Sequence, residues 1–178
     1  MHILKKISGL ILFTLLNLIN IRLLWSPLGN VLEDLRMIAL RWQGASIAED
    51  SFVRPYAQIT SPKNLTLGKK SKINNNAQLY LFEKLTIGNN VEIGPEFLVY
   101  TGEHKIDDPS KPLAKQGNYN EPVIIEDDVY IGARVTVLKG VKISNRVVVA
   151  AGAVVTESLG SGYIYGGVPA KQIRKLAV

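Results

Sequence analysis

The sequence predicts a mainly β protein: a parallel β-helix of triangular cross-section, with a helical extension before it and a short helix after it. Three observations predict this fold. Aliphatic residues recur every six positions from Ile47 onward. Where extra residues interrupt this spacing, they follow the third six-residue unit of a group of three. A separate apolar stretch of helical character precedes the repeat. We therefore expect a helical extension over residues 1–45 and the β-helix domain over residues 46–178, with a long loop at 105–124.

The extension differs in composition from the rest of the chain. From Ile3 to Trp25 it is rich in Leu and Ile, and Pro27 ends the run. Interspersed polar residues leave it short of the roughly 20 successive apolar residues that cross a bilayer. We favour a helix that packs on a neighbouring subunit or lies in a membrane interface, with a membrane span, a targeting sequence and a plain cap on the β-helix as alternatives. A second helix should end at Gly44.

The repeat places two side chains of every six residues inside. The first set consists of Ile, Leu or Val throughout: Ile47, Val53, Ile59, Leu67, Ile73, Leu79, Ile87, Ile93, Val99, Ile125, Ile131, Val137, Ile143, Val149 and Val155. Side chains four residues later are mostly small or apolar. Inward-facing side chains recur every 3.6 residues in a helix and every two in a strand. When each flat face takes six residues, successive inward-facing side chains are four and then two residues apart.

Breaks in the register indicate how many faces make one turn. Extra residues follow Ile59, Leu79 and Val99, each the third unit of its group. If three faces make a turn, all these insertions leave the solenoid at one corner and the stacked core is undisturbed.

Composition excludes several classes of function. The chain of 178 residues contains no cysteine, so it has neither disulfides nor thiolate metal sites. It also lacks a zinc-ligand spacing and a phosphate-binding glycine loop, and we expect no metal requirement. The net charge is +6, but the basic residues form no dense run and aromatic residues make up only 7%. We therefore expect no nucleic-acid partner.

The best candidate for chemistry is His104, which lies where the third turn releases its long loop. An imidazole titrates near neutrality and suits proton abstraction, and long loops on rigid scaffolds are often functional. Acidic neighbours that are candidates to orient the ring are Glu103, Asp107 and Asp108. Basic residues on the expected C-terminal helix, Lys171 and Arg174, either meet an anionic cofactor or are solvated.

From about residue 40 to 176 the chain resembles the hexapeptide-repeat O-acetyltransferases, which include maltose, galactoside and nodulation acetyltransferases, and especially those of exopolysaccharide biosynthesis such as the colanic acid type. The resemblance rests on SPKNLTLG, KLTIGNNVEIG, TGEHKIDDPSKPL, PVIIEDDVYIGARVTVLKGVKI, VVAAGAVVT and GGVPAKQIRKL. It implies a left-handed β-helix and a homotrimer with active sites between subunits. It also implies acetyl-CoA as co-substrate, bound in a groove between neighbouring β-helices.

The resemblance implies roles for individual residues as well. His104 matches the histidine that deprotonates the acceptor hydroxyl. Ala133 and Ala151 match positions whose backbone contacts the pantetheine arm, and Asn76 is the nearest match to an acceptor-binding asparagine. The remaining matches to cofactor-binding positions are Tyr130, where the family often has Trp, Thr156, Lys171 and Arg174.

We therefore expect acetyl transfer from acetyl-CoA to a hydroxyl of a sugar or glycan intermediate, in surface polysaccharide biosynthesis. The expected location is the cytoplasm, with association of residues 1–25 with the inner face of the cytoplasmic membrane as the membrane hypothesis. Two alternatives stay open: N-acyl transfer to an amino sugar, and a solenoid that binds a partner without catalysis.

Overall fold

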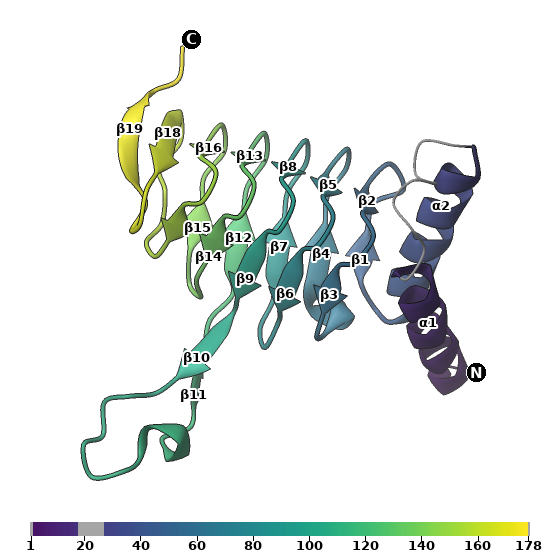
Figure 1. The fold of residues 1–178 in the computed structure, drawn as a ribbon, viewed down its shortest axis with the longest axis horizontal. Helices are drawn as coiled ribbons and strands as arrows, with labels where there is room; N and C mark the ends of the chain where they lie inside the picture. Colours follow the sequence, from purple (N-terminus) through teal and green to yellow (C-terminus); the bar gives the residue numbers. More distant parts are fainter. Residues whose placement is uncertain (1, 18–26, 178) are drawn as a thin grey trace.

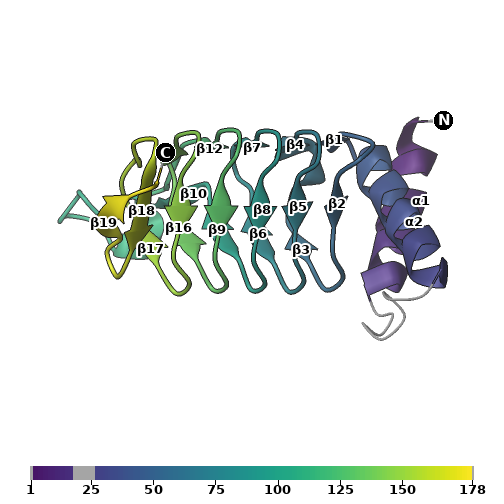
Figure 2. The ribbon, with the colours of Figure 1, turned by 90° about the horizontal axis from the view of Figure 1, so that it is seen from above.

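The computed structural model describes residues 2–17 and 27–177. They form a solenoid whose N-terminal end is covered by two helices, and a hairpin arm projects from its side (Figure 1). Turned by 90°, the molecule shows its turns stacked in a single row from the helices to the C-terminal strands (Figure 2).

Three parallel sheets make the faces of the solenoid. Face A contains β1 (Ser46–Ile47), β4 (Leu65–Leu67), β7 (Leu85–Ile87), β12 (Val123–Ile125) and β15 (Lys142–Ile143). Face B contains β2 (Phe52–Val53), β5 (Lys72–Ile73), β8 (Glu92–Ile93), β13 (Tyr130–Ile131), β16 (Val148–Val149) and β18 (Tyr163–Gly166). Face C contains β3 (Gln58–Ile59), β6 (Gln78–Tyr80), β9 (Leu98–Tyr100), β14 (Thr136–Val137) and β17 (Val154–Val155). The predicted triangular solenoid is confirmed.

The aliphatic repeat forms ladders inside the solenoid. On face B, Val53 pairs in register with Ile73, which pairs with Ile93, and this pairs with Ile131. These side chains have no exposed surface. Corners of successive turns lie close together: a Cβ atom on Gly132 would lie 2.6 Å from the backbone nitrogen of Ala151 in the next turn. Stacking of successive turns therefore depends on both the aliphatic ladders and the small corner residues.

The two N-terminal helices close the first turn. Helix α2 (Pro27–Trp42) ends as predicted at Gly44, whose φ is 99°. The Ala45 N–H donates to the Leu40 carbonyl and the Gly44 N–H to that of Arg41, as in a Schellman cap. The Arg41 guanidinium donates to the carbonyls of Ile47 and Ala48 in the first turn. Helix α2 thus acts as a cap for the open end of the solenoid.

Helix α1 (His2–Asn17) packs on α2 rather than on the solenoid core. The helices approach closely at Gly9, where a Cβ atom would lie 2.8 Å from the Ala39 carbonyl oxygen. The rest of the predicted first helix, up to Trp25, lies outside the described residues. No helix within residues 2–17 and 27–177 is both long and apolar enough to span a membrane.

The predicted C-terminal helix is wrong. Residues Lys171–Lys175 form strand β19, which pairs antiparallel with β18. The chain reverses at Gly167, whose φ is 95°. Because β18 is the last parallel strand of face B, its outer edge offers free backbone groups, and pairing with them outweighs the weak helical preference of a short polar segment.

Candidate active site

The long excursion after face C is a hairpin arm. Strands β10 (Gly102–His104) and β11 (Asn118–Asn120) pair antiparallel, with Gly102 opposite Asn120, Glu103 opposite Tyr119 and His104 opposite Asn118. The arm leaves from the end of β9 and returns to face A at β12, so it starts at the corner that the register breaks predicted. His104 is exposed and stands at the end of β10.

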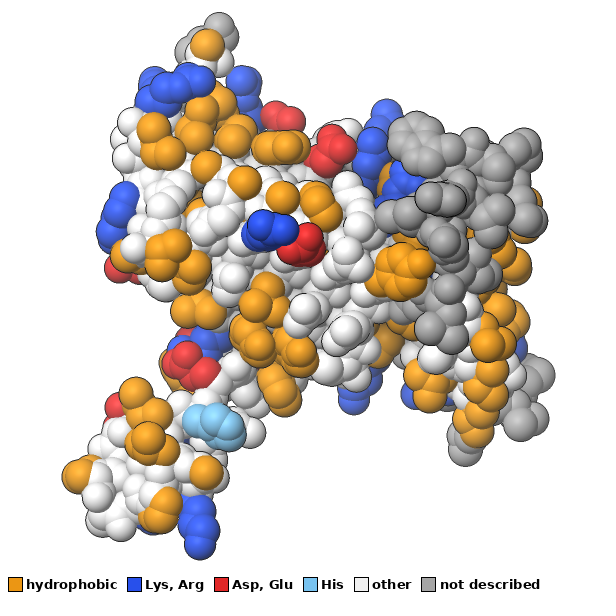
Figure 3. Space-filling view, in the orientation of Figure 1, with side chains coloured by type: hydrophobic (Ala, Val, Ile, Leu, Met, Phe, Trp, Pro, Cys, Tyr) orange, Lys and Arg blue, Asp and Glu red, His pale blue; other side chains and the backbone are white. Residues whose placement is uncertain are grey.

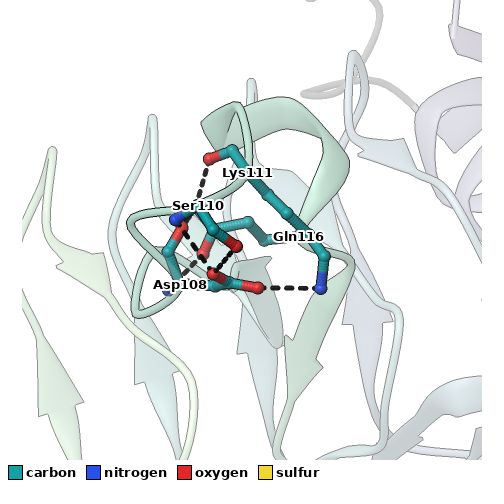
Figure 4. A network of polar contacts seen from close by, with 4 residues as sticks. All are labelled: Asp108, Ser110, Lys111 and Gln116. Carbon is teal, nitrogen blue, oxygen red and sulfur yellow. Dashed lines mark hydrogen bonds and ion pairs between the residues drawn. The ribbon is translucent and has the colours of Figure 1, made fainter.

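A network around Asp108 holds the far end of the arm together (Figure 4). The Asp108 carboxylate accepts hydrogen bonds from the Ser110 hydroxyl at 2.5 Å and from the Ser110 backbone N–H at 3.0 Å. It also forms an ion pair with the Lys111 ammonium at 2.7 Å. The Gln116 amide donates to the backbone carbonyls of Asp108 and Lys111. Lys111 and then Ser110 lower the pKa of the Asp108 carboxyl below its ordinary value.

Alternation along the strands gives the arm two faces at its base. Side chains directly opposite each other lie on the same face of a hairpin, and sequence neighbours lie on opposite faces. Gly102, His104, Asn118 and Asn120 therefore share one face, and Glu103, Tyr119 and Glu121 share the other. The imidazole consequently lies among amides rather than carboxylates.

The acidic face of the arm is bound by Lys139, which follows β14 in the next turn of the solenoid. Its ammonium lies 2.8 Å from a Glu103 carboxylate oxygen, 3.6 Å from one of Glu121 and 4.3 Å from the centroid of the Tyr119 ring. The side chain of Lys139 is only 14% exposed. The hydrogen bond to Glu103 raises the pKa of the ammonium above its ordinary value, and Glu121 adds to the shift. Lys139 thereby ties both strands of the arm to the body.

The base of the arm and the body enclose a pocket of about 470 Å³. The body contributes Phe82, Tyr100, Leu138 and Lys139, and the arm contributes Gly102, Glu103, His104, Asn118 and Asn120. In Figure 3, hydrophobic side chains gather on the body beside the base of the arm. An apolar wall facing a few polar groups is typical of small-molecule sites.

Among residues 2–17 and 27–177, no hydrogen bond or ion pair joins a carboxylate to the imidazole of His104. Glu103 pairs with Lys139, and Asp108 is engaged by Ser110 and Lys111. Asp107 is exposed further along the arm. Within the described ranges, no group of three His, Asp, Glu or Cys side chains is arranged to hold a metal ion.

Three of the predicted cofactor-binding residues flank face C. Ala133 and Ala151 occupy the corner before this face in successive turns, and the Gly152 N–H donates to the Ala133 carbonyl. Thr156 follows β17 and so lies at the other corner of face C, between faces C and A. The arm leaves the solenoid at this same corner two turns earlier. Lys171 is brought near by its ion pair with Glu157, at 3.6 Å. Ala133, Ala151 and Thr156 thus lie along the two edges of face C, His104 lies on the arm that leaves one of these edges, and Lys171 reaches the same edge from β19 through Glu157.

Other predicted residues lie elsewhere. Tyr130 begins β13 at the opposite edge of face B and is 51% exposed. Arg174 lies on β19, where its guanidinium donates to the carbonyl of Lys175. Asn76 is exposed in the turn between β5 and β6, with φ of 60°, and does not line the pocket.

Sequence reasoning missed the body side of the pocket. Tyr80 and Tyr100 directly follow the inward residues Leu79 and Val99, so their stacking was readable from the register. Phe82 and Lys139 carried no such signal, because their role depends on the direction in which the arm projects.

Comparison with known proteins defines the class. A family profile described as "Hexapeptide repeat of succinyl-transferase" matches residues 122–157, so this is a hexapeptide-repeat protein. Galactoside O-acetyltransferase of Lactococcus lactis is 33% identical over 144 residues, which cover 79% of this chain and 68% of the relative. A putative colanic acid biosynthesis acetyltransferase, WcaF of Escherichia coli, is 32% identical over 151 residues, covering 85% and 79%. The chain belongs to the hexapeptide-repeat acetyltransferase family and is an acetyltransferase.

Coverage of the relatives is uneven. A putative acetyltransferase of Schizosaccharomyces pombe is 38% identical over 113 residues, 64% of this chain but only 54% of that protein.

Solved structures share the fold over almost the whole chain. A hexapeptide-repeat acetyltransferase of Vibrio cholerae complexed with acetyl coenzyme A superposes with a TM-score of 0.81 at 28% identity, covering 98% of this chain and 88% of that chain. A galactoside acetyltransferase in complex with coenzyme A gives 0.80 at 25% identity, covering 99% and 82%.

Proposed function

We propose that the protein transfers an acetyl group from acetyl-CoA to a hydroxyl of a sugar or glycan intermediate, with His104 as general base. The observation that carries the proposal is the position of this imidazole, which faces an apolar wall across a pocket beside face C. Relatives named galactoside O-acetyltransferase, and similar structures that contain acetyl-CoA or CoA, support the donor and the acceptor class.

In the proposed reaction, the imidazole of His104 takes the proton of the acceptor hydroxyl while the oxygen attacks the thioester carbonyl. The tetrahedral intermediate then expels the CoA thiolate, which receives the proton from the imidazolium. The products are an acetyl ester and free CoA thiol. General base catalysis of this kind contributes a factor of about 10²–10⁴.

The cofactor would lie along face C. Small side chains at Ala133 and Ala151 leave the corner backbone open to the pantetheine arm, and Thr156 lies at the other edge. Lys171 and Arg174 supply positive charge for phosphates. Glu157 partly neutralises Lys171 through its ion pair, so we assign the larger electrostatic contribution to Arg174.

We further propose a homotrimer with active sites between subunits. Tyr130 lies at the opposite edge of face B from Ala133, and Asn76 lies several turns away from Thr156 along the solenoid. In a trimer, a neighbouring subunit would present Asn76 to ligands bound beside face C.

The outer face of α1 supports membrane association. Ile7, Leu10, Ile11 and Leu15 are each more than half exposed, and Lys5 is exposed at the same end of the helix. Helix α1 has no acidic residue in its first turn. An apolar stripe with basic residues at one end suits an anionic membrane surface. We therefore place the enzyme at the inner face of the cytoplasmic membrane, acting on intermediates of surface polysaccharide biosynthesis.

The test measures thiol release from acetyl-CoA with methyl galactoside, methyl glucoside and glucosamine as acceptors. Replacing His104 by Ala should lower kcat by about 10²–10⁴. Lys105→Ala, one residue further along the arm, is the matched control and should retain activity. Turnover of His104→Ala at the wild-type rate contradicts the mechanism, and acetylation of glucosamine on nitrogen alone favours the N-acyl alternative.

A further inference from the structure

A stack of aromatic side chains stands on the body beside the arm. Tyr80 and Tyr100 are register partners at the ends of β6 and β9, and their rings lie parallel, with centroids 4.7 Å apart and 4° between planes. In the next turn Leu138 follows Val137, the register partner of Val99. Such a ladder stabilises a parallel solenoid, and this role is sufficient to explain the contact between Tyr80 and Tyr100.

Phe82 is not explained by the ladder. It lies two residues beyond Tyr80, where the chain leaves face C, and its side chain is 54% exposed, whereas the preceding Leu81 is buried. Its ring reaches the base of the arm: a Cβ atom on Gly102 would lie 3.1 Å from Phe82 Cδ2. The ring therefore stands at the junction between body and arm, in the wall of the pocket that contains His104.

Phe82 and Tyr100, which we call the aromatic wall, form the apolar side of this pocket together with Leu138. Tyr80 stands behind Tyr100 and does not line the pocket. Across from the wall, the arm presents His104 together with the amides of Asn118 and Asn120. The pocket thus has an apolar side formed by two rings and Leu138 and a polar side formed by an imidazole and two amides, with the ion pair of Glu103 and Lys139 also in its lining.

This division matches the two kinds of surface on a pyranose. One side of the sugar ring carries C–H bonds that pack on an aromatic ring, while hydroxyls at its rim require hydrogen-bond partners. An open-chain polyol has the same hydroxyls but no flat C–H face. A ring that packs on the wall would present its rim hydroxyls to the arm.

We propose that the aromatic wall is the acceptor subsite, and that a pyranose ring packs on Tyr100 and Phe82 so that one of its hydroxyls faces His104. The inference rests on the proposed function and adds to it the residues that select a cyclic sugar. Asn118 and Asn120 accept and donate hydrogen bonds at the remaining hydroxyls. Discrimination against open-chain polyols follows from the contact with the rings.

The chain offers a matched pair of variants. Tyr100→Leu and Tyr80→Leu each remove one ring of the same stack, so both lose the stacking contact, but only Tyr100 lines the pocket. For Tyr100→Leu and Phe82→Leu we expect the KM for methyl galactoside or methyl glucoside to rise about tenfold, with the KM for acetyl-CoA within about twofold of wild type. Tyr80→Leu should leave both KM values near wild type.

A binding measurement separates this inference from the proposed function. Saturation-transfer NMR of the wild type should show contact with methyl galactoside or methyl glucoside and none with sorbitol, and the signal should fall in Tyr100→Leu but not in Tyr80→Leu. Glycosides that bind in this way without being acetylated overturn the proposed function and leave the subsite standing. Equal effects of the two tyrosine variants, or no saturation transfer from the wild type to either glycoside, overturn the subsite.

Discussion

Replacing Lys139 by Met should loosen the arm and slow catalysis without affecting the binding of acetyl-CoA. The ammonium holds Glu103 on β10 and Glu121 just after β11, and it lies over the Tyr119 ring. The carboxylates are 54% and 37% exposed, so solvent screens each ion pair to about 0.5 kcal/mol. The cation–π contact adds about 0.5 kcal/mol. The total of about 1.5 kcal/mol corresponds to a change of roughly tenfold in the ratio of docked to undocked arms.

Two measurements report on that ratio. In Lys139→Met, kcat should fall by up to about tenfold while the KM for acetyl-CoA stays near wild type, because the proposed cofactor positions lie on the solenoid. Trypsin should cleave the arm up to about tenfold faster, since cleavage of a transiently opened segment tracks its open population. Lys139→Arg keeps the charge and should restore both. Lys142→Met removes an ion pair with Glu126 at 2.7 Å on face A and is the matched control. If Lys139→Met and Lys142→Met behave alike in both assays, the proposed attachment of the arm by Lys139 is refuted.

Three further predictions concern the core, the arm and α1. Ile131→Ala removes a fully buried side chain from the face B ladder and should lower the free energy of unfolding by about 2–5 kcal/mol in a denaturant titration. The control Ile124→Ala, at an exposed position, should change the free energy of unfolding by less than about 0.5 kcal/mol. Equal effects of the two variants would contradict the inward register. Asp108 has a lowered pKa in the folded arm, so its contribution to arm order should be complete above its ordinary pKa of 3.8 and lost as the pH falls through the lower pKa of the folded arm. The protection factor of the Ser110 amide, which corrects for the intrinsic pH dependence of exchange, should then fall below pH 3.8 in the wild type but not in Asp108→Asn, and a constant protection factor in the wild type would exclude this role. Finally, the wild type should float with vesicles of phosphatidylglycerol and phosphatidylcholine, and Leu10→Glu should not; recovery of the wild type in the lipid-free fraction would contradict membrane association.

The solenoid was predictable because its period is local. Each inward residue sits six positions from the next, and an extra segment must leave at a corner if the ladder is to continue. The end of α2 was predictable for a similar reason, since Gly44 adopts a positive φ that suits glycine. The hand of the solenoid does not follow from the period, and the left-handed form stays an expectation from the resemblance.

The error at the C-terminus shows where local preference fails. Residues Lys171–Lys175 are too few to sustain a helix by themselves, and the edge of β18 offers them a full set of backbone partners. That edge is created by the stacking of the preceding turns, and nothing within the segment indicates it.

The triangular solenoid and the point of departure of the arm could be predicted from the sequence alone, and with them His104 as the candidate base at the root of the arm. These features depend on spacing along the chain. Three features became visible in the folded structure alone: Glu103 binds Lys139 rather than His104, the imidazole shares a pocket with Phe82 and Tyr100, and Ala133, Ala151 and Thr156 flank one face. Those contacts join different turns through the angle at which the arm leaves the body. That angle is set by the ion pairs and packing of residues far apart in the chain, and no local pattern encodes it.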